Sequence, residues 1–312
     1  MTGFLGIDTS NYTTSAAFIN TNGVITQEKK LLPVKKGEKG IRQSDAVFHH
    51  TVQLPMVMDS LYESLGDTPK IEAIGASARP RRDINSYMPC FHVGNTNAHN
   101  IGKVLGVPVY TFSHQEGHVA AALYSSGRQD LFGKRFLAFH LSGGTTESLL
   151  IEPGPESILT ATCIGRSLDL KAGQAVDRTG LMLGLSFPCG PELEKLALKS
   201  KEEFKIRPSL KGFDCSLSGI ENQCMNKKEK GMKEEDIALF CLESIGAAVN
   251  GMAEALLKEY PGLPLVFSGG VMSNSIIRKR LESNFDCAFA EPAFSADNAA
   301  GTALLTSLTK DF

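Results

Sequence analysis

Apolar residues recur along the chain either in short continuous runs or at helical spacing. Short runs bounded by turn residues predict buried strands, and apolar residues at three- and four-residue intervals predict amphipathic helices. The predicted strands are residues 4–8, 16–19, 24–30, 71–77, 107–112, 136–141, 148–151 and 265–268. The predicted helices are residues 45–65, 96–105, 169–183, 191–199, 236–260, 273–282 and 297–308, and one more begins directly after residue 112. Strands that alternate with helices predict an α/β fold.

A strand, a polar turn and a returning strand open the chain, and the same order restarts downstream. The first turn is Thr9-Ser10-Asn11-Tyr12-Thr13-Thr14-Ser15, and the second is Ser142-Gly143-Gly144-Thr145-Thr146. This repetition predicts two related lobes, and a chain of 312 residues exceeds what one compact core usually serves. Backbone N–H groups in such turns can bind a phosphate, although a Ser/Thr-rich hairpin is more commonly only a hairpin.

Charge and composition narrow the function classes. The net charge is -2, and the lysine runs at residues 29–39 and 227–233 are interrupted by glutamate and glycine. A solvated loop accounts for both lysine runs, and the more specific alternative is that they contact RNA phosphates. Seven cysteines at irregular spacing fit neither a disulfide scaffold nor a structural zinc site. No signal peptide and no run approaching the roughly 20 apolar residues that span a bilayer are predicted, so the expected compartment is the cytoplasm.

Two histidines four residues apart predict a metal site. His114 and His118 would lie on one face of a helix, where two imidazole nitrogens can bind one cation. Asp297 is the candidate carboxylate that would complete a two-histidine, one-carboxylate set for zinc or iron. The alternative is that the histidines cap or hydrate an ordinary helix and that Asp297 is a first-turn helix acid. The order of this motif is not the His-Glu-x-x-His of metalloproteases.

Two glycine pairs that follow predicted strands indicate a nucleotide site. Gly143-Gly144 and Gly269-Gly270 would let the backbone approach a ligand, and a helix N-terminus just beyond would attract phosphate. One such pair alone is more commonly a turn, but two pairs in the same relation to their strands favour a nucleotide cleft. Asp177 and Glu194 lie beside other glycines and are candidates to bind ribose hydroxyls, although exposed helix acids are the default.

Seven short motifs, in their order along the chain, carry a resemblance to a known family. They are residues 114–118, 141–145, 173–178, 188–191, 216–219, 268–274 and 297–298. With these motifs the chain resembles, nearly end to end, the TsaD family, the tRNA threonylcarbamoyladenosine transferases once called glycoproteases. The resemblance implies an actin-like, Hsp70-like ATPase (ASKHA) fold, in which two ribonuclease-H-like lobes hold the ligand in an interlobe cleft. It implies an N-terminal lobe of residues 1–108 plus a C-terminal helix, 299–312, and a C-terminal lobe of residues 109–298 that carries the metal and nucleotide motifs.

The resemblance also implies an acyltransferase activity and a set of site residues. The reaction would be metal-dependent transfer of a threonylcarbamoyl group from its adenylate to N6 of an adenosine near the tRNA anticodon. The implied partners are tRNA and TsaB-like and TsaE-like subunits, with no membrane. The metal, iron or zinc, would be bound by His114, His118 and Asp297. The residues that would bind ATP or threonylcarbamoyl-adenylate are His140, Leu141, Ser142, Gly143, Gly144, Asp177, Gly190, Glu194 and Asn274. No catalytic side chain is assigned.

The chain departs from the family pattern at several positions, and these departures indicate an alternative function. Tyr12 and Thr13 stand where the family has two acids, and Ala78-Arg79-Pro80-Arg81-Arg82 replaces Gly-Pro-Gly. Thr145 replaces a histidine, and Asp169-Leu170-Lys171-Ala172 replaces Asp-Asp-Ala-Ala. The alternative is a divergent paralogue that binds ATP and metal. Such a paralogue would carbamoylate another acceptor or act as a non-catalytic assembly or regulatory module.

Overall fold

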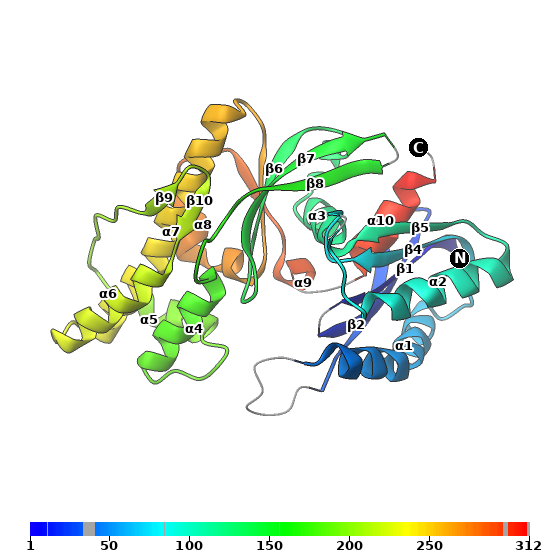
Figure 1. The fold of residues 1–312 in the computed structure, drawn as a ribbon, viewed down its shortest axis with the longest axis horizontal. Coiled ribbons are helices and arrows are strands. Elements are labelled where there is room, and N and C mark those ends of the chain that lie inside the picture. The colour runs from blue at the N-terminus through cyan, green and yellow to red at the C-terminus, as the bar shows by residue number, and fades with distance from the viewer. Residues whose placement is uncertain (11, 34–40, 84, 156, 296–298, 311–312) are drawn as a thin grey trace. The chain divides into compact units, whose positions relative to one another are not determined.

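Two units, each built around a five-stranded sheet, make up the part of the chain that the structure describes (Figure 1). The structure, a computed structural model, describes residues 1–312 except 11, 34–40, 84, 156, 296–298 and 311–312. Unit 1 consists of Met1–Lys134, Glu152–Ala161 and Ala293–Phe312, and unit 2 of Arg135–Ile151 and Thr162–Pro292. The predicted α/β class is confirmed in both units.

The sheet of unit 1 combines an antiparallel meander with two parallel strands. Its strands are β1 (Thr2–Ser10), β2 (Thr13–Asn20), β3 (Ile25–Leu31), β4 (Lys70–Arg79) and β5 (Val109–Ser113), in the order β3-β2-β1-β4-β5. β1, β2 and β3 are antiparallel, whereas β1, β4 and β5 run parallel. The carboxyl ends of the three parallel strands therefore meet at one edge of the sheet, where ligand-binding residues of open α/β sheets gather.

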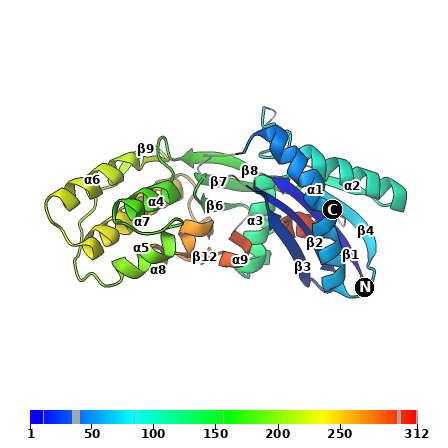
Figure 2. The same ribbon diagram turned by 90° about the horizontal axis from the view of Figure 1, so that it is seen from below.

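Strand alternation in β1 assigns its residues to two different helix layers. Leu5 and Ile7 belong to the apolar cluster with α1 (Gln43–Leu65) and α2 (Phe91–Leu105), which lie side by side (Figure 2). Gly6, on the opposite face, packs against α10 (Ala300–Thr309), which in turn packs against α3 (His114–Ser125). Because side chains in a strand alternate between faces, Asp8 points toward the same layer as Gly6.

The contact between α3 and α10 is close enough to require glycine. A Cβ atom built at Gly301 would lie 1.8 Å from the carbonyl oxygen of Gly117. We therefore expect Gly301→Ala to lower the free energy of unfolding by about 2 kcal/mol, because the backbones of the two helices must separate. Thermal or urea unfolding followed by circular dichroism measures the effect. Gly219→Ala in α6 (Ser218–Glu229) is the control, because the nearest atom to its Cβ is 3.8 Å away, and equal losses in both variants would contradict the prediction.

The sheet of unit 2 repeats the topology of unit 1. Its order is β12-β11-β6-β7-β8, with β6 antiparallel to β7 and parallel to β11, which is parallel to β12. The bounds are β6 (Phe136–Leu141), β7 (Thr146–Gly154), β8 (Ser157–Arg166), β11 (Leu265–Ser268) and β12 (Cys287–Phe289). β6, β7, β11 and β12 thus correspond to β1, β2, β4 and β5, and the β6–β7 hairpin is the repeat that the strand-turn-strand pattern predicted. A small hairpin, β9 (Ser209–Lys211) with β10 (Asp214–Ser216), is separate.

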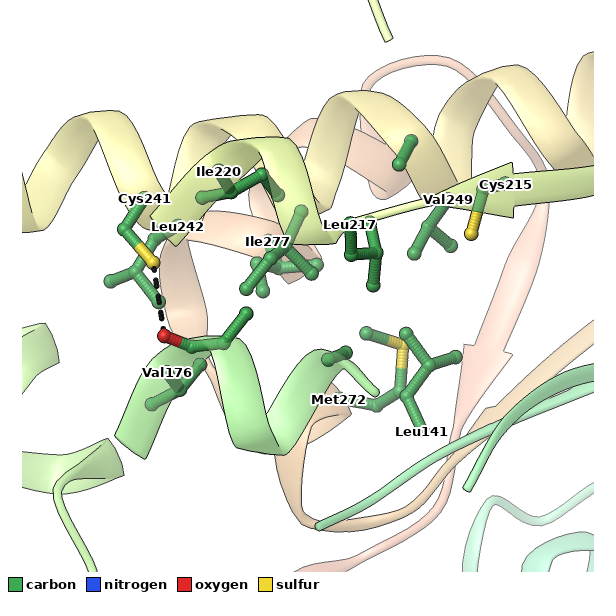
Figure 3. Close-up of a cluster of buried hydrophobic side chains, with 14 of the residues drawn as sticks. Leu141, Val176, Cys215, Leu217, Ile220, Cys241, Leu242, Val249, Met272 and Ile277 are labelled. Atoms are coloured by element: carbon green, nitrogen blue, oxygen red, sulfur yellow. Dashed lines mark hydrogen bonds between the residues drawn. The ribbon is translucent and has the colours of Figure 1, made fainter. Parts of the chain in front are cut away.

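Helices of unit 2 pack around α7, the longest of them. They are α4 (Ala172–Met182), α5 (Gly190–Ala197), α6, α7 (Glu234–Glu259) and α8 (Ser275–Glu282), with short helical turns at Gln129–Leu131, Gly270–Ser273 and Pro292–Ser295 elsewhere in the chain. α7 contacts α5, α6 and α8. Leu242 of α7, Val176 of α4 and Ile277 of α8 belong to one buried cluster (Figure 3).

α7 is more apolar over its length than the sequence pattern indicated. Among the described residues it is long and apolar enough to cross a membrane by length and composition, but 72% of its most apolar window is buried inside the protein. Its apolar side chains therefore serve the core of unit 2. A helix that is apolar on nearly all sides is buried either in a large core or in a membrane, and here the packing accounts for it.

Several elements differ from the prediction. α2 begins at Phe91 and not at residue 96, and β8, β12 and α6 were not predicted. α6 was not predicted because it is polar around most of its surface, and its buried residues are Ile220 and Cys224. Unit 1 extends to Lys134, past the boundary predicted at residue 108, because α3 packs against α10.

Candidate functional site

The histidine pair lies in the first turns of α3, directly after the carboxyl end of β5. The ring centroids of His114 and His118 are 4.3 Å apart, so the predicted spacing does bring the two imidazoles together. Ser113 and Glu116 begin the helix through a capping box, in which Ser113 Oγ accepts the Glu116 N–H at 3.2 Å and Glu116 Oε2 accepts the Ser113 N–H at 2.8 Å. The capping role that the alternative gave to the histidines is therefore filled by other residues.

A buried aspartate, which the sequence analysis did not include in the site, orients the first histidine. Asp8 Oδ2 lies 2.8 Å from His114 Nδ1 and accepts a hydrogen bond from Ser77 Oγ at 2.7 Å, while Asp8 Oδ1 accepts the Ser10 N–H at 2.8 Å. Burial raises the pKa of Asp8, but the His114 imidazole and these hydrogen bonds outweigh it, so that the pKa lies below its ordinary value. The carboxyl group is therefore ionised at neutral pH.

The arrangement of these side chains fits part of a metal site. A carboxylate that binds Nδ1 of a histidine leaves Nε2 as the ligand nitrogen, which is the usual support for a metal-binding histidine. The predicted third ligand, Asp297, lies outside the described residues. Within the described ranges, no group of three His, Cys, Asp or Glu side chains is placed to bind a metal ion. His114 and His118, which were predicted as two of three ligands, lie together, and Asp8 contacts the first of them.

Unit 2 contains a separate cavity of about 310 Å³. It is lined by Ser142, Gly143, Gly173, Val176, Asp177, Pro188, Gly190, Pro191, Glu194, Leu242, Gly270, Val271, Ser273 and Asn274. Six of the predicted nucleotide residues lie in this lining, namely Ser142, Gly143, Asp177, Gly190, Glu194 and Asn274. The size and the mixture of apolar walls with a few polar groups are typical of a small-molecule site.

Three helices begin at this cavity. Gly173 lies in the first turn of α4, Gly190 is the first residue of α5, and Asn274 caps α8. Asn274 Oδ1 accepts the N–H groups of Ile276 and Ile277, both at 3.1 Å. Backbone N–H groups and the helix dipole make each such terminus favourable for a negative charge. The dipoles of the three helices therefore add positive potential to one cavity, although the first N–H groups of α4 and α8 already donate hydrogen bonds within the protein.

Glycine allows the first of these helices to lie against the loop after β6. The Gly173 N–H donates to the Ser142 carbonyl at 3.1 Å. A Cβ atom at Gly173 would lie 2.7 Å from the Gly143 backbone, so any larger residue would push the loop away from α4. The Ala172 N–H donates to Thr146 Oγ1 at 2.8 Å, which fixes the same helix on β7. The loop and the helix N-terminus therefore form one rigid wall of the cavity.

The two predicted acids connect other parts of the cavity lining. Asp177 Oδ1 accepts the Cys189 N–H at 2.9 Å, and Glu194 Oε1 accepts the Ser275 N–H at 2.7 Å. A carboxylate has two oxygens and about four acceptor positions, so each acid can also accept a ligand hydroxyl. Burial, together with the charges of Asp177 and Glu192, raises the pKa of the Cys189 thiol, which is a poor nucleophile at neutral pH.

The remaining predicted nucleotide residues lie outside the lining. His140 Nδ1 is 3.1 Å from Ser268 Oγ, and Leu141 is only 1% exposed and belongs to the core. Gly144 follows Gly143 in the turn between β6 and β7. Val176 and Leu242, which form apolar parts of the lining, were not predicted, because an apolar residue that lines a cavity has the same helical spacing as one that packs in a core.

The altered Asp169 segment anchors a loop of unit 2. Asp169 Oδ1 accepts the N–H groups of Leu170 and Leu217 at 2.6 and 2.7 Å, and Oδ2 accepts Ser218 Oγ at 2.6 Å. Burial raises the pKa of this carboxyl group, but the hydrogen bonds outweigh it and lower the pKa below its ordinary value of 3.8. The ionised form is therefore the one that stabilises the loop.

This anchor predicts a pH-dependent stability. Because the pKa of Asp169 is lower in the folded protein, its stabilisation is complete above pH 3.8 and is lost as the pH falls through the folded-state pKa. We expect Asp169→Asn to lower the free energy of unfolding by about 1 kcal/mol at neutral pH, since the group is largely exposed and screened. Urea unfolding of both proteins between pH 3 and pH 7 measures the difference. A difference that stays constant into acid would contradict the role of the charge.

A family model and individual relatives of this chain have the same family description. The model of the family "TsaD: tRNA N6-adenosine threonylcarbamoyltransferase" matches residues 24–304. A protein of Thermus thermophilus named tRNA N6-adenosine threonylcarbamoyltransferase is 30% identical over 309 residues, which cover 96% of this chain and 90% of that protein. A protein of Thermococcus sibiricus with the same name is 28% identical over 282 residues, which cover 89% of this chain and 81% of that protein.

Solved structures share the fold. The structure of T. kodakarensis HypF superposes with a TM-score of 0.67 and 14% sequence identity, and the match covers 99% of this chain and 48% of the HypF chain. At this identity the likeness shows the fold alone. It is the predicted actin-like, Hsp70-like ATPase fold, to which the two repeated sheets also belong.

Proposed function

Since the chain belongs to the TsaD family of tRNA N6-adenosine threonylcarbamoyltransferases, we propose that it transfers a threonylcarbamoyl group from its adenylate to N6 of an adenosine near the tRNA anticodon. The observation that carries the proposal is the cavity of unit 2, where three helices begin beside two carboxylates. An adenylate has an anionic phosphate, ribose hydroxyls and an apolar base. Each of these parts has a matching group in the lining.

The cavity residues divide into three roles. The phosphate would lie beside the Ser142-Gly143 backbone, where the dipoles of α4 and α8 add positive potential. Asp177 and Glu194 would accept hydrogen bonds from ribose hydroxyls, and Val176 and Leu242 would pack against the base. The hydrogen bonds that fix both acids and Gly173 would keep this geometry ready before the ligand binds.

His114, His118 and Asp297 would bind one divalent metal ion, iron or zinc, in unit 1. When bound, such an ion supplies a Lewis acid that polarises a carbonyl and offsets negative charge. Asp8 would keep Nδ1 of His114 occupied, so that Nε2 is available as a ligand. Both imidazoles bind the metal as neutral groups, and the protonated state competes with it.

The reaction is an acyl transfer. The N6 amine attacks the carbamoyl carbonyl carbon, the bond from that carbon to the adenylate oxygen breaks, and AMP leaves with the electron pair while N6 loses a proton. Because an aromatic amine is a weak nucleophile, positioning should supply much of the rate. The Gly143 N–H group would steady the charge that develops on the carbonyl oxygen.

The departures near the first hairpin favour a second candidate, a paralogue that binds nucleotide without this transfer. Tyr12 is 40% exposed and Thr13 is buried, and neither supplies the carboxylate that the family has at these positions. A non-catalytic module would keep the cavity and lose the transfer. tRNA, a TsaB-like subunit and a TsaE-like subunit are the partners that we propose for the catalytic function.

One experiment separates the two candidates. The purified protein is incubated with threonylcarbamoyl-adenylate and unmodified tRNA, with and without TsaB-like and TsaE-like subunits, and the tRNA nucleosides are analysed by mass spectrometry. We expect threonylcarbamoyladenosine when the tRNA has its acceptor adenosine, and none with a tRNA in which guanosine replaces it. Nucleotide binding without any modified adenosine would overturn the transferase and support the non-catalytic module.

A further inference from the structure

The segment from Arg79 to His92, which replaces the glycine-rich turn of the family, is attached to the histidine turn of α3. Arg79 pairs with Ser113 in the β4–β5 ladder, and the Pro80 carbonyl accepts the Gln115 N–H at 3.1 Å. Arg82 Nε lies 2.7 Å from Glu116 Oε1, and the Glu116 side chain is only 1% exposed. These contacts hold the beginning of the segment against the first turn of α3.

The end of the same segment returns to the histidines. The Phe91 ring lies 6.1 Å from the His114 ring, and the neighbouring His92 ring lies 5.5 Å from that of Tyr87. Tyr87 is 67% exposed, although its ring is held beside His92. The segment therefore borders the histidine pair at both of its ends. The segment is therefore part of the immediate surroundings of His114.

The side chains of this segment have the chemistry of a single-strand RNA surface. Arg79, Arg81 and Arg82 are exposed guanidinium groups, and Tyr87 adds an exposed aromatic ring. Arginine binds phosphate through a planar fork of donors, and a base can stack on tyrosine. Asp83 is the acid within the described part of the segment, and Asp83 Oδ1 accepts the Asn85 N–H at 3.3 Å. The described part of the segment therefore has a positive net charge and one exposed aromatic ring.

We propose that Arg79, Arg81 and Tyr87 bind the RNA strand that carries the acceptor adenosine, through two phosphate contacts and one stacked base. The proposal rests on the proposed function, which requires an RNA acceptor. Arg82 serves as the clamp to Glu116 and holds the segment in place. The Arg81 N–H donates to Ser86 Oγ at 3.0 Å, which brings the residue before Tyr87 close to the Arg81 backbone. RNA is favoured over an acidic protein because an exposed ring belongs to the same segment as the cations, and a ring of this kind is used to stack bases.

The test measures the affinity for unmodified tRNA across a salt series, by fluorescence anisotropy with labelled tRNA. Each phosphate contact contributes about 0.7 to the slope of log K against log salt for a single strand, so Arg79→Ala with Arg81→Ala should reduce the slope by about 1.4. Tyr87→Ala should weaken binding by roughly tenfold with little change in slope, because stacking releases no counterions. Thermal unfolding of each variant verifies that it folds.

The matched control removes two cations from the other ends of the same elements. Lys70 begins β4 and Lys103 lies in the last turn of α2, and both are exposed. Lys70→Ala with Lys103→Ala should leave the slope unchanged. An unchanged slope in the arginine variant, or an equal reduction in the control, overturns the proposal. If the wild-type protein forms modified adenosine while the arginine and tyrosine variants bind tRNA normally, only the RNA surface fails. If it forms none, the proposed function fails.

Discussion

Replacing Gly143 with leucine is expected to lower the affinity for ATP by about 100-fold or more while leaving the fold intact. Gly143 lines the cavity of unit 2, and a Cβ atom built there meets nothing within 4 Å. Its backbone is outside the left-handed region, so a larger residue fits without strain. The added side chain would then fill space that the nucleotide needs, where even a small displacement removes several contacts at once.

Isothermal titration with ATP, together with thermal unfolding, measures both parts of this expectation. Gly219→Leu in α6 is the control, since that position is also open and lies outside the cavity lining. The control should bind ATP as the wild type does. Unchanged ATP affinity in the Gly143 variant, with normal folding, would show that the nucleotide binds elsewhere and would remove the main support for the proposed adenylate site.

The α/β class and the repeated lobe pattern could be predicted because they depend on local signals. Buried strands such as residues 136–141 are mostly apolar runs, and the glycine pairs that follow them mark turns. Elements with weak signals were missed. β12 has three residues, and α6 turns a mostly polar surface to solvent, so neither presents a pattern that differs from a loop.

Residue spacing alone could predict the candidate site only where its residues are close in sequence, whereas the cavity residues, which are far apart in the chain, came from the family resemblance. His114 and His118 are one helical turn apart, and the structure brings their rings together. Asp8 is 106 residues away from His114, and what joins them is the parallel order of β1, β4 and β5. A carboxylate at the end of the first buried strand was the available signal, but its partner depends on strand order, which periodicity does not reveal.

Long-range pairing also explains why the altered segments were difficult to interpret. Arg82 stands in the segment that replaces Gly-Pro-Gly of the family, and it forms an ion pair with Glu116 of the histidine motif. Asp169 looked like a departure from a site motif, yet it anchors the backbone of Leu217 and Ser218. In both cases the charge of the residue is evident from the sequence, but its partner is known only from the structure.

Removing either histidine of the pair is expected to have the largest effect on the transfer. If His114 and His118 are two of three metal ligands, His114→Ala or His118→Ala should weaken Zn²⁺ binding by at least about 1,000-fold and reduce threonylcarbamoyladenosine formation by a similar factor. Asp8→Asn should have a smaller effect, of about 10- to 100-fold on Zn²⁺ affinity, because it changes the support of His114 and not a ligand.

Competition titration with a coloured chelator measures the Zn²⁺ affinity, and mass spectrometry of tRNA nucleosides measures the product. His99→Ala is the control, because His99 is an exposed histidine of α2 in the same unit. It should change neither quantity. The graded order, with the ligand variants most affected and Asp8→Asn intermediate, is the specific result, since a loss of folding would reduce all three variants without that order. If the histidine variants bind Zn²⁺ as tightly as the His99 control does, the pair is not a metal site, and the contact between Asp8 and His114 serves only to hold α3 on the sheet.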